Sequence, residues 1–229
     1  MNPALRRCAA HVVVDSVDHP HPSDDDAHHL FRVLRLRDGE VVTVTDGRGA
    51  WRATQVSGGA LRPVGDVVHE PAPRTAVIAT AVPKGDRLEW MVQKLTELGA
   101  TEIVLVDCAR SVVRWDAARA AKQLTRLERV VREAACQSRR VWLPALTGPV
   151  PFAEAAARPG MALADPDGDG PVTADVDGLL VGPEGGFTDD EEAAATRRVR
   201  LTDTVLRVET AAVASLCALT VLRGDLHGA

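Results

Sequence analysis

The stretch TAVIATAVPKGDRLEWMVQKLTELGATEIVLVD, residues 75–107, contains two apolar runs separated by a segment with helical spacing. The runs TAVIATAV and EIVLVD have the length and the β-branched content of buried strands. Between them, apolar residues recur at helical intervals from Leu88 to Leu98, and Gly99 stands where the residue after a helix end is expected. The stretch therefore predicts a strand, a helix and a second strand of a parallel sheet.

The alternation of strand-like and helical segments continues toward the C-terminus. The expected elements are a helix over about 116–137, strands at 161–165 and 177–182, a helix from Thr188, a short strand at 200–201 and a last helix over about 210–223. Elements of these lengths in this order predict an α/β domain over 73–229, with a mostly parallel sheet covered by helices.

The first part of the chain has a different pattern, which predicts a small β-rich domain over 1–72. Four short strands are expected at 11–14, 40–46, 50–56 and 61–68, separated by Gly, Pro and Asp turns. Between the first two, residues 24–36 are expected to form a helix with Leu30, Val33 and Leu34 on one face. The two prolines of EPAPRT, 70–75, are typical of a linker.

Composition limits the class of protein. The 229 residues carry a net charge of −5, and no window approaches the roughly 20 apolar residues of a membrane span. We therefore expect a cytoplasmic protein without a membrane partner. The four cysteines are far apart in the sequence, which favours buried small side chains over disulfides.

The charge is distributed unevenly along the chain. Residues 110–140 carry nine basic and three acidic side chains, whereas 141–195 carry one basic and eleven acidic ones. A solvated helix face explains the basic window, and so does a surface that binds phosphates. The pattern alone leaves both interpretations open.

The stretch VGPEGGFTDDE, 181–191, follows a predicted strand and precedes a predicted helix. Thr188 and Glu191 have the spacing of a capping box, so the loop is held at both ends. Its glycines allow a ligand to approach the backbone, and Pro183 stiffens it. The spacing is not that of a phosphate-binding loop, and Glu184 would repel a phosphate. The loop indicates a site for a neutral or cationic ligand, although a tight turn that only starts a helix remains an alternative.

A second unusual stretch is LRVETAAVASL, 206–216. Its small residues permit close helix packing, and Thr210 is expected to cap the helix start. Arg207 and Glu209 precede that start, where an isolated pair would most often be a surface ion pair.

Together, the two stretches resemble the paired signature of the RsmE family, ribosomal RNA small-subunit methyltransferase E, within the SPOUT superfamily. HHLFRVLRLRDGE, KGDRLEWMVQKLTELGATEI, RSVVRW and EAACQSRR resemble further blocks of this family, in the same order. The resemblance covers roughly residues 28–223.

The resemblance implies a PUA-like β-barrel domain at the N-terminus and a SPOUT α/β domain with a deep trefoil knot, assembled as a homodimer. It implies methyl transfer from S-adenosylmethionine to N3 of the uridine at position 1498 of 16S ribosomal RNA in the small subunit. The cofactor is a cation without phosphate, which agrees with the character of the glycine-rich loop. The cofactor pocket would be formed by Gly182, Pro183, Glu184, Gly185, Gly186, Leu201, Thr202, Leu206 and Arg207.

The reaction itself suggests roles for charged residues. Uridine N3 carries a proton, so the enzyme must accept that proton or stabilise the uridinate. We expect Arg207 to stabilise the charge on the base oxygens, with Glu209 and Glu184 as weaker candidates for the base. No metal is expected: the histidines near residues 19–29 lack a third ligand at metal-site spacing.

RNA binding is expected in two places. The β-rich domain would contact RNA near Arg32, Arg35 and Arg37, and the basic window would extend the phosphate-binding surface. The candidate residues of that window are Arg110, Arg132, Arg139 and Arg140.

The sequence departs from the family pattern at Thr202, Ala109 and Arg139 and in the loop 164–171, the expected third wall of the pocket. Two alternatives therefore stay open: a SPOUT enzyme that modifies another base or RNA, and an RNA-binding homologue that has lost methylation.

Overall fold

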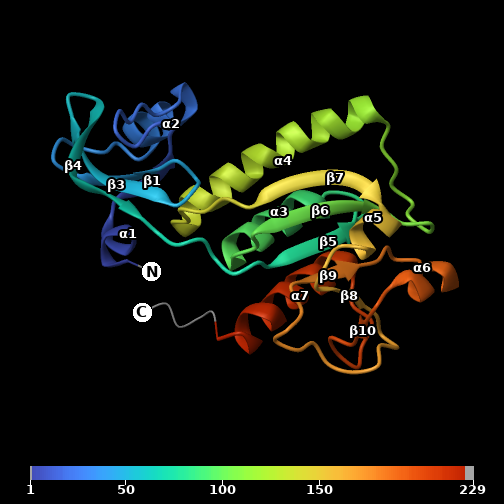
Figure 1. Cartoon of the computed structure of the whole chain (residues 1–229). Helices are drawn as coiled ribbons and strands as arrows, with labels where there is room; N and C mark the ends of the chain where they lie inside the picture. The colour runs from blue at the N-terminus through green and yellow to red at the C-terminus, as the bar shows by residue number, and fades with distance from the viewer. Residues whose placement is uncertain (1, 225–229) are drawn as a thin grey trace. The chain divides into compact units, whose positions relative to one another are not determined.

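The computed structural model describes residues 2–224, which form two compact units (Figure 1). The first unit comprises 2–73 together with 132–143, and the second comprises 74–131 and 144–224. The division between residues 73 and 74 falls within the proline-rich segment 70–75. The segment 132–143, however, lies in the first unit, although the expected boundaries assign it to the second domain. In the described chain, no helix is both long and apolar enough to span a bilayer.

The first unit is built on a four-stranded sheet in the order β1-β2-β3-β4. β1 and β2 are parallel, and the other neighbours are antiparallel. β1 and β4 are the two edges, so the described residues form an open sheet and the expectation of a closed barrel is corrected. Pro63 lies in β4, where an edge strand tolerates a missing N–H. The elements are α1 (Pro3–Arg7), β1 (Ala10–Val13), α2 (Asp24–His28), η1 (His29–Val33), β2 (Val41–Thr45), β3 (Ala50–Ser57) and β4 (Ala60–His69).

The segment 132–143 is bound to this unit by backbone and side-chain contacts. The N–H of Gly49 donates to Val141 O and that of Leu143 donates to Gly47 O. His11 is buried in β1, with Nε2 3.0 Å from Arg140 O and Nδ1 2.8 Å from Thr43 Oγ1. These contacts explain why a segment distant in sequence belongs to the first unit.

The expected helix over 24–36 is shorter and less regular in the structure. α2 runs into a π-helical turn, η1, and the chain leaves it at Leu34. Leu30 is buried as expected, but Val33 is 58% exposed and Leu34 is 43% exposed. The expected regular helix face of these three residues is therefore not a buried one, and the wider π turn changes the angular spacing of its side chains.

The second unit contains a six-stranded sheet in which every pair is parallel, in the order β10-β8-β9-β5-β6-β7. This confirms the α/β interpretation. Its elements are β5 (Val77–Ala81), α3 (Arg87–Leu98), β6 (Glu102–Asp107), α4 (Ala117–Ser138, of which 132–138 lie in the first unit), β7 (Ala145–Pro151), α5 (Phe152–Ala156), β8 (Met161–Ala164), β9 (Gly178–Val181), α6 (Asp189–Ala194), β10 (Arg198–Val199) and α7 (Val208–Leu222).

Both faces of this sheet are covered. α7 contacts α3, β5 and β9, whereas α5 contacts β6, β7, β8 and α6. On the α5 side, alternate strand residues such as Ala79, Val104 and Leu180 pack with Phe152 and Phe187. Their neighbours in the strands point to the opposite face, because side chains alternate along a strand. The four cysteines are free; two of them, Cys8 and Cys108, are buried, and the other two are half-buried.

β7 and α5 were not expected from the sequence. β7 contains Gly148, Pro149 and Pro151, which are depleted in strands. Gly148 is required here, because a Cβ at this position would lie 2.2 Å from Leu105 O in β6.

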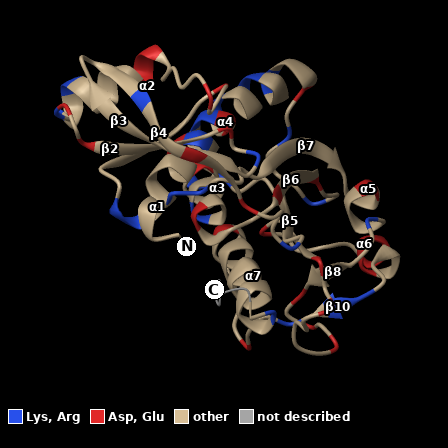
Figure 2. Cartoon of the chain, turned by 60° about the vertical axis from the view of Figure 1, so that its left-hand side comes forward, with Lys and Arg blue, Asp and Glu red and all other residues tan. Residues whose placement is uncertain are grey.

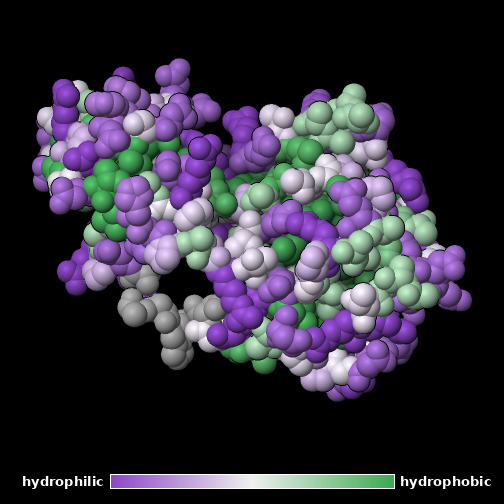
Figure 3. Space-filling model, viewed as in Figure 1, coloured by the Kyte–Doolittle hydropathy of each residue, from purple (hydrophilic) through white to green (hydrophobic). Residues whose placement is uncertain are grey.

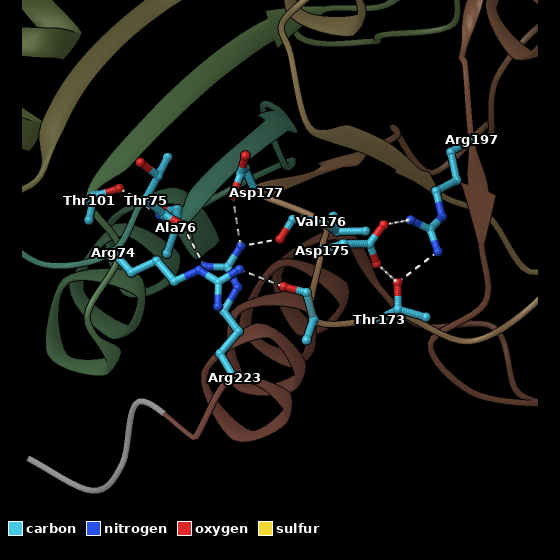
Figure 4. A network of polar contacts seen from close by, with 11 residues as sticks. Arg74, Thr75, Ala76, Thr101, Thr173, Asp175, Val176, Asp177, Arg197 and Arg223 are labelled. Atoms are coloured by element: carbon cyan, nitrogen blue, oxygen red, sulfur yellow. Dashed lines mark hydrogen bonds and ion pairs between the residues drawn. The ribbon is translucent and has the colours of Figure 1, made fainter.

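The C-terminal end of α7 is attached to the loops that lead into β5 and β9 (Figure 4). The side chain of Arg223 is fully buried and donates to Thr75 O and Val176 O, and it lies 3.5 Å from Asp177 Oδ1. Arg74 makes a parallel contact, donating to Ala174 O at 2.7 Å. These bonds fix one end of the helix whose other end reaches the candidate site.

Candidate functional site

A cavity of about 290 Å³ lies in the second unit, where β8 and β9 end. Ligands bind at this edge in open α/β sheets, because the loops and helix N-termini meet there. Four segments form its walls, together with Arg110 and Glu192: Ala164–Asp167, Val181–Phe187 except Gly185, Leu201–Leu206 except Asp203, and Val208 with Ala211.

The glycine-rich loop has a defined geometry. Gly186 N donates to Pro183 O at 2.9 Å, which closes a tight turn, and Gly186 has a φ of +69° that favours glycine. A Cβ on Gly182 would lie 2.7 Å from Cζ of Phe187, so only glycine fits above that ring. Gly185 does not line the cavity and has no positive φ. The backbone requirement for glycine therefore rests on Gly182 and Gly186.

The helix after the loop begins as predicted. Thr188 is the N-cap of α6 and forms a capping box with Glu191. The buried Glu191 carboxylate also accepts a hydrogen bond from the N–H of Ala109 at 2.7 Å. Glu191 therefore connects the loop after β6 to the loop after β9.

Arg110 is a second connection between the same two loops. Its Nη1 donates to Phe187 O at 2.6 Å and to Gly185 O at 3.2 Å. Arg110 was predicted as an RNA-binding residue. The structure places it in the wall of the cavity, where it supports the glycine-rich loop; its RNA binding stays a prediction.

The loop after β8 supplies the expected third wall. Asp165 Oδ1 accepts from the N–H of Asp167 at 2.8 Å, and Asp165 Oδ2 lies 2.9 Å from Arg198 Nη2. Gly168 packs closely against the backbone of Val199, so a Cβ at this position would lie only 2.5 Å from Val199 C. The loop is thus ordered, although its sequence departs from the family pattern. Its lining residues were missed, and the turn-forming run DPDG was the available signal.

Four carboxylates and one guanidinium, that of Arg110, line the cavity, so its electrostatics favour a cation. Arg198 pairs with two of its carboxylates, Asp165 and Glu192. Glu184 and Asp167 form no ion pair with a described residue, and Glu184 Oε1 is at the limit of hydrogen bonding, 3.5 Å from Lys84 N. Two unpaired carboxylates beside apolar walls agree with a ligand that combines a positive charge with apolar groups.

The predicted catalytic residues Arg207 and Glu209 lie beside the cavity and do not line it. Arg207 is the N-cap residue of α7, and its exposed side chain makes no hydrogen bond or ion pair with a described residue. Glu209 is buried, and its Oε1 lies 3.3 Å from Nε of Arg87 at the start of α3. The expectation that Thr210 caps the helix is wrong, because α7 begins at Val208.

The other predicted RNA-binding residues lie in the first unit and divide into two groups. Arg32, Arg35 and Arg37 are exposed on and just after η1, beside the exposed Val33 and Leu34. The exposed guanidinium groups of this segment are of the kind that bind RNA phosphates and stack on bases.

Arg132, Arg139 and Arg140 instead make contacts within the first unit. Arg132 lies 2.8 Å from Asp26 Oδ2, and Arg139 donates to Cys136 O at 3.2 Å and to Cys8 O at 3.4 Å. Burial lowers the pKa of the Arg140 guanidinium to about 10. Their RNA binding stays a prediction, but these contacts already have a structural role. Among residues 2–224, no cluster of three His, Cys, Asp or Glu side chains is arranged to hold a metal.

Comparison with known proteins places this geometry in a family. The model of an RNA methyltransferase domain matches residues 70–220, and the model of an RNA methyltransferase PUA domain matches 22–59. The chain is 34% identical over 223 residues to ribosomal RNA small subunit methyltransferase E of Mycobacterium bovis, an alignment that covers 86% of this chain and 84% of the relative. The chain belongs to the ribosomal RNA small subunit methyltransferase E family. The resemblance identified from the two late motifs is confirmed.

Two further members of the methyltransferase E family are similar to this chain over most of its length. The Bacillus subtilis member is 30% identical, with 88% of this chain and 91% of the relative covered. The crystal structure of the Neisseria gonorrhoeae member, bound to S-adenosyl methionine, superposes with a TM-score of 0.73 at 27% identity and covers 93% of this chain and 97% of that one.

Proposed function

We propose that this chain transfers a methyl group from S-adenosylmethionine to N3 of the uridine at position 1498 of 16S ribosomal RNA. The observation that carries the proposal is the cavity at the edge of β8 and β9, with a glycine-rich loop that carries the unpaired Glu184 on one side and the unpaired Asp167 on another. Membership of the methyltransferase E family supports the choice of reaction and of RNA.

The cavity fits the proposed cofactor. When bound, S-adenosylmethionine supplies an electrophilic methyl group on a positively charged sulfur. Leu201, Leu206 and Val181 provide apolar surface for a purine ring, and Glu184 offers a negative charge. Thr202, where the family pattern differs, lines the same wall with a hydroxyl 3.4 Å from that of Thr204. Gly185 and Arg207 stay predicted cofactor contacts, although neither lines the cavity.

The residues around the cavity can assist deprotonation of the uridine. Arg207 is adjacent to two lining residues, Leu206 and Val208, and its guanidinium is free to reach the oxygens of a bound base. A planar cation at this point stabilises the uridinate. Glu184 lies in the cavity wall and is the better-placed base. Because Glu209 is buried and paired with Arg87, we assign it the positioning of the α7 start.

RNA binding is proposed for the surface formed by Arg32, Arg35 and Arg37, which lies within the matched PUA region. In this proposal the RNA partner of the chain is 16S ribosomal RNA in the small ribosomal subunit, and the reaction takes place in the cytoplasm. We further propose a SPOUT trefoil knot in the second unit, as the resemblance implies.

A homodimer is proposed on the side of the sheet covered by α3 and α7. Trp90 is 47% exposed on α3, and Val221 and Leu222 are exposed on α7. Two helices that pack together and leave apolar side chains uncovered are suited to a second copy of the chain. Light scattering of the purified protein tests this proposal. We expect the wild type to be a dimer and Trp90→Glu to be a monomer. A monomeric wild type would contradict the proposal.

The function is tested by two measurements on the purified chain. Isothermal calorimetry should detect binding of S-adenosylmethionine. Incubation with unmethylated small subunits and labelled cofactor, followed by nucleoside mass spectrometry, should give N3-methyluridine. A protein that binds RNA but gives no heat with the cofactor would be a non-catalytic homologue, and methyl on another nucleoside would indicate a different target base.

A further inference from the structure

A second cavity, of about 400 Å³, lies in the same unit. Three segments form it: the loop Val82–Asp86 with the start of α3, the loop that carries Val113 and Trp115, and the face of α4 that carries Arg119, Gln123, Arg126 and the buried Leu127. Its volume lies within the roughly 300–1,000 Å³ of small-molecule sites. The cavity is separate from the candidate cofactor site, since the two share no lining residue.

Several polar groups of this cavity are available to a ligand. The side chains of Trp115, Arg119 and Gln123 make no hydrogen bond or ion pair with a described residue. By contrast, the carboxylate of Glu89 pairs with Arg126 across α3 and α4. The cavity thus offers an indole, an amide and a guanidinium, while one of its two carboxylates is already neutralised.

The first turns of α4, beside this cavity, combine small side chains with basic ones. α4 begins with alanines at 117, 118, 120 and 121, and its first turns are pale green in the space-filling view (Figure 3). Arg119 and Lys122 belong to these first turns, and further basic segments follow along the α4 ribbon (Figure 2). Asp86 and Glu89 are the acidic residues that line the cavity, and a separate acidic group forms the first turn of α6.

We infer that the second cavity binds an unstacked nucleotide of the RNA substrate. Bases that leave an RNA stack are typically held by an aromatic side chain and by hydrogen bonds to their edges, which Trp115 and the Gln123 amide can provide. A guanidinium such as that of Arg119 binds phosphate through two hydrogen bonds. The remaining carboxylate, Asp86, accepts hydrogen bonds from ribose hydroxyls and repels phosphate, so the sugar would face Asp86 and the phosphate Arg119.

The position of the cavity agrees with this role, which rests on the proposed methyltransferase function. Its loop Val82–Asp86 touches the cofactor site, where Lys84 N lies 3.5 Å from Glu184 Oε1. The loop that contributes Trp115 also contributes Arg110 to the cofactor site. An RNA strand held in the second cavity is therefore directed along two loops toward the site of methyl transfer.

The inference is tested with Trp115→Ala and Arg119→Ser in the full-length protein. The probe is a labelled, uridine-containing RNA of about ten nucleotides, a length within the site sizes of single-strand binding proteins. Trp115→Ala should bind it about 10-fold to 100-fold more weakly, and Trp115→Phe should recover most of the affinity. Thr125→Ala, an exposed and uncharged position of α4 outside the cavity, is the control and should bind normally.

Three further readouts separate the possible outcomes. Calorimetric affinity for S-adenosylmethionine and the oligomeric state should be unchanged in every variant, and cross-linking of thiouridine-containing RNA should map to the segment 113–127. Wild-type RNA affinity in Trp115→Ala, or a loss that follows a change in oligomeric state, would overturn the inference. A wild-type protein that methylates no RNA would instead refute the proposed function.

Discussion

At the scale of single residues, substitution of Arg207 is predicted to lower the methylation rate more than any other change. Arg207→Lys retains the charge but loses the planar fork, so the methylation rate should fall by about 10²-fold while cofactor affinity stays near normal. Arg207→Ala should be slower still. Its rate should recover partly as the pH rises, because uridine N3 ionises by itself in alkaline solution.

The measurement is single-turnover methylation between neutral and mildly alkaline pH. If Arg207→Ala runs parallel to the wild type across this range, Arg207 does not act on deprotonation. The Glu184→Gln variant, measured in the same way, would then test whether Glu184 accepts the proton from uridine N3.

The glycine-rich loop gives a second prediction at this scale. A β-branched side chain at Gly186 is disfavoured by its φ of +69°, so Gly186→Val should distort the turn and abolish detectable binding of S-adenosylmethionine. Gly170→Ala is the matched control, because a Cβ there meets no atom within 4 Å. Calorimetry compares the two, and unchanged affinity in Gly186→Val would show that the loop does not hold the cofactor.

His11 predicts a pH dependence of stability. Desolvation by burial lowers the pKa of His11 to about 4, with the hydrogen bond to Arg140 O opposing this shift. The unfolded chain, with a pKa near 6.5, then binds the proton more readily, so stability is lost as the pH falls from about 6.5 toward 4. The expected loss between pH 7 and pH 5 is about 2 kcal/mol.

Hydrogen exchange of the β1 and β2 amides reports this loss in the unit that contains His11. The same measurement on His11→Gln is the control, because that variant has no imidazole to protonate. An equal decrease in both proteins would assign the pH dependence to other groups.

At the scale of secondary-structure elements, the start of α7 is held by the pair formed by Arg87 and Glu209. Arg87→Ala leaves the Glu209 carboxylate buried without this partner. Since Arg87 is partly exposed, we expect a modest loss of about 1 kcal/mol in unfolding free energy. Methylation should slow as well, because Arg207 lies two residues before Glu209.

Glu209→Gln, combined with Arg87→Ala, removes the unpaired charge and should restore part of the stability. Denaturant unfolding measures the stability and single-turnover kinetics the rate. A double variant no more stable than Arg87→Ala alone would show that the pair does not hold the helix start.

The elements show which features the sequence determined. α3 and the capping box of α6 were predictable, because helical spacing, Gly99 and the pair Thr188 and Glu191 are local signals. β7 was not, because glycine and proline are poor strand signals: the prolines are tolerated at the edge of the sheet, and Gly148 permits the close approach to β6. The extent of the helix over 24–36 was also mispredicted, since nothing local distinguishes a π turn from an α turn.

At the scale of the whole chain, the sequence predicted two parts and a ligand loop at 181–187, which lines a cavity, but not the membership of 132–143. α4 is one continuous helix, yet its residues from Arg132 onward belong to the first unit. Helical periodicity continues through that point, so no local pattern marks the change. The resemblance implied that the loop 164–171 forms a wall, but its lining residues, Ala164–Asp167, were not named, because they depend on contacts with β10 that only the fold brings together.

The central claim is methylation of one uridine in 16S ribosomal RNA, and nucleoside mass spectrometry of that RNA tests it most directly. RNA is isolated from a strain that lacks the gene, and from the same strain carrying the wild-type or the Gly186→Val protein. We predict that N3-methyluridine at position 1498 is absent without the gene, returns with the wild type and does not return with Gly186→Val. The same methylation in all three strains would contradict the account.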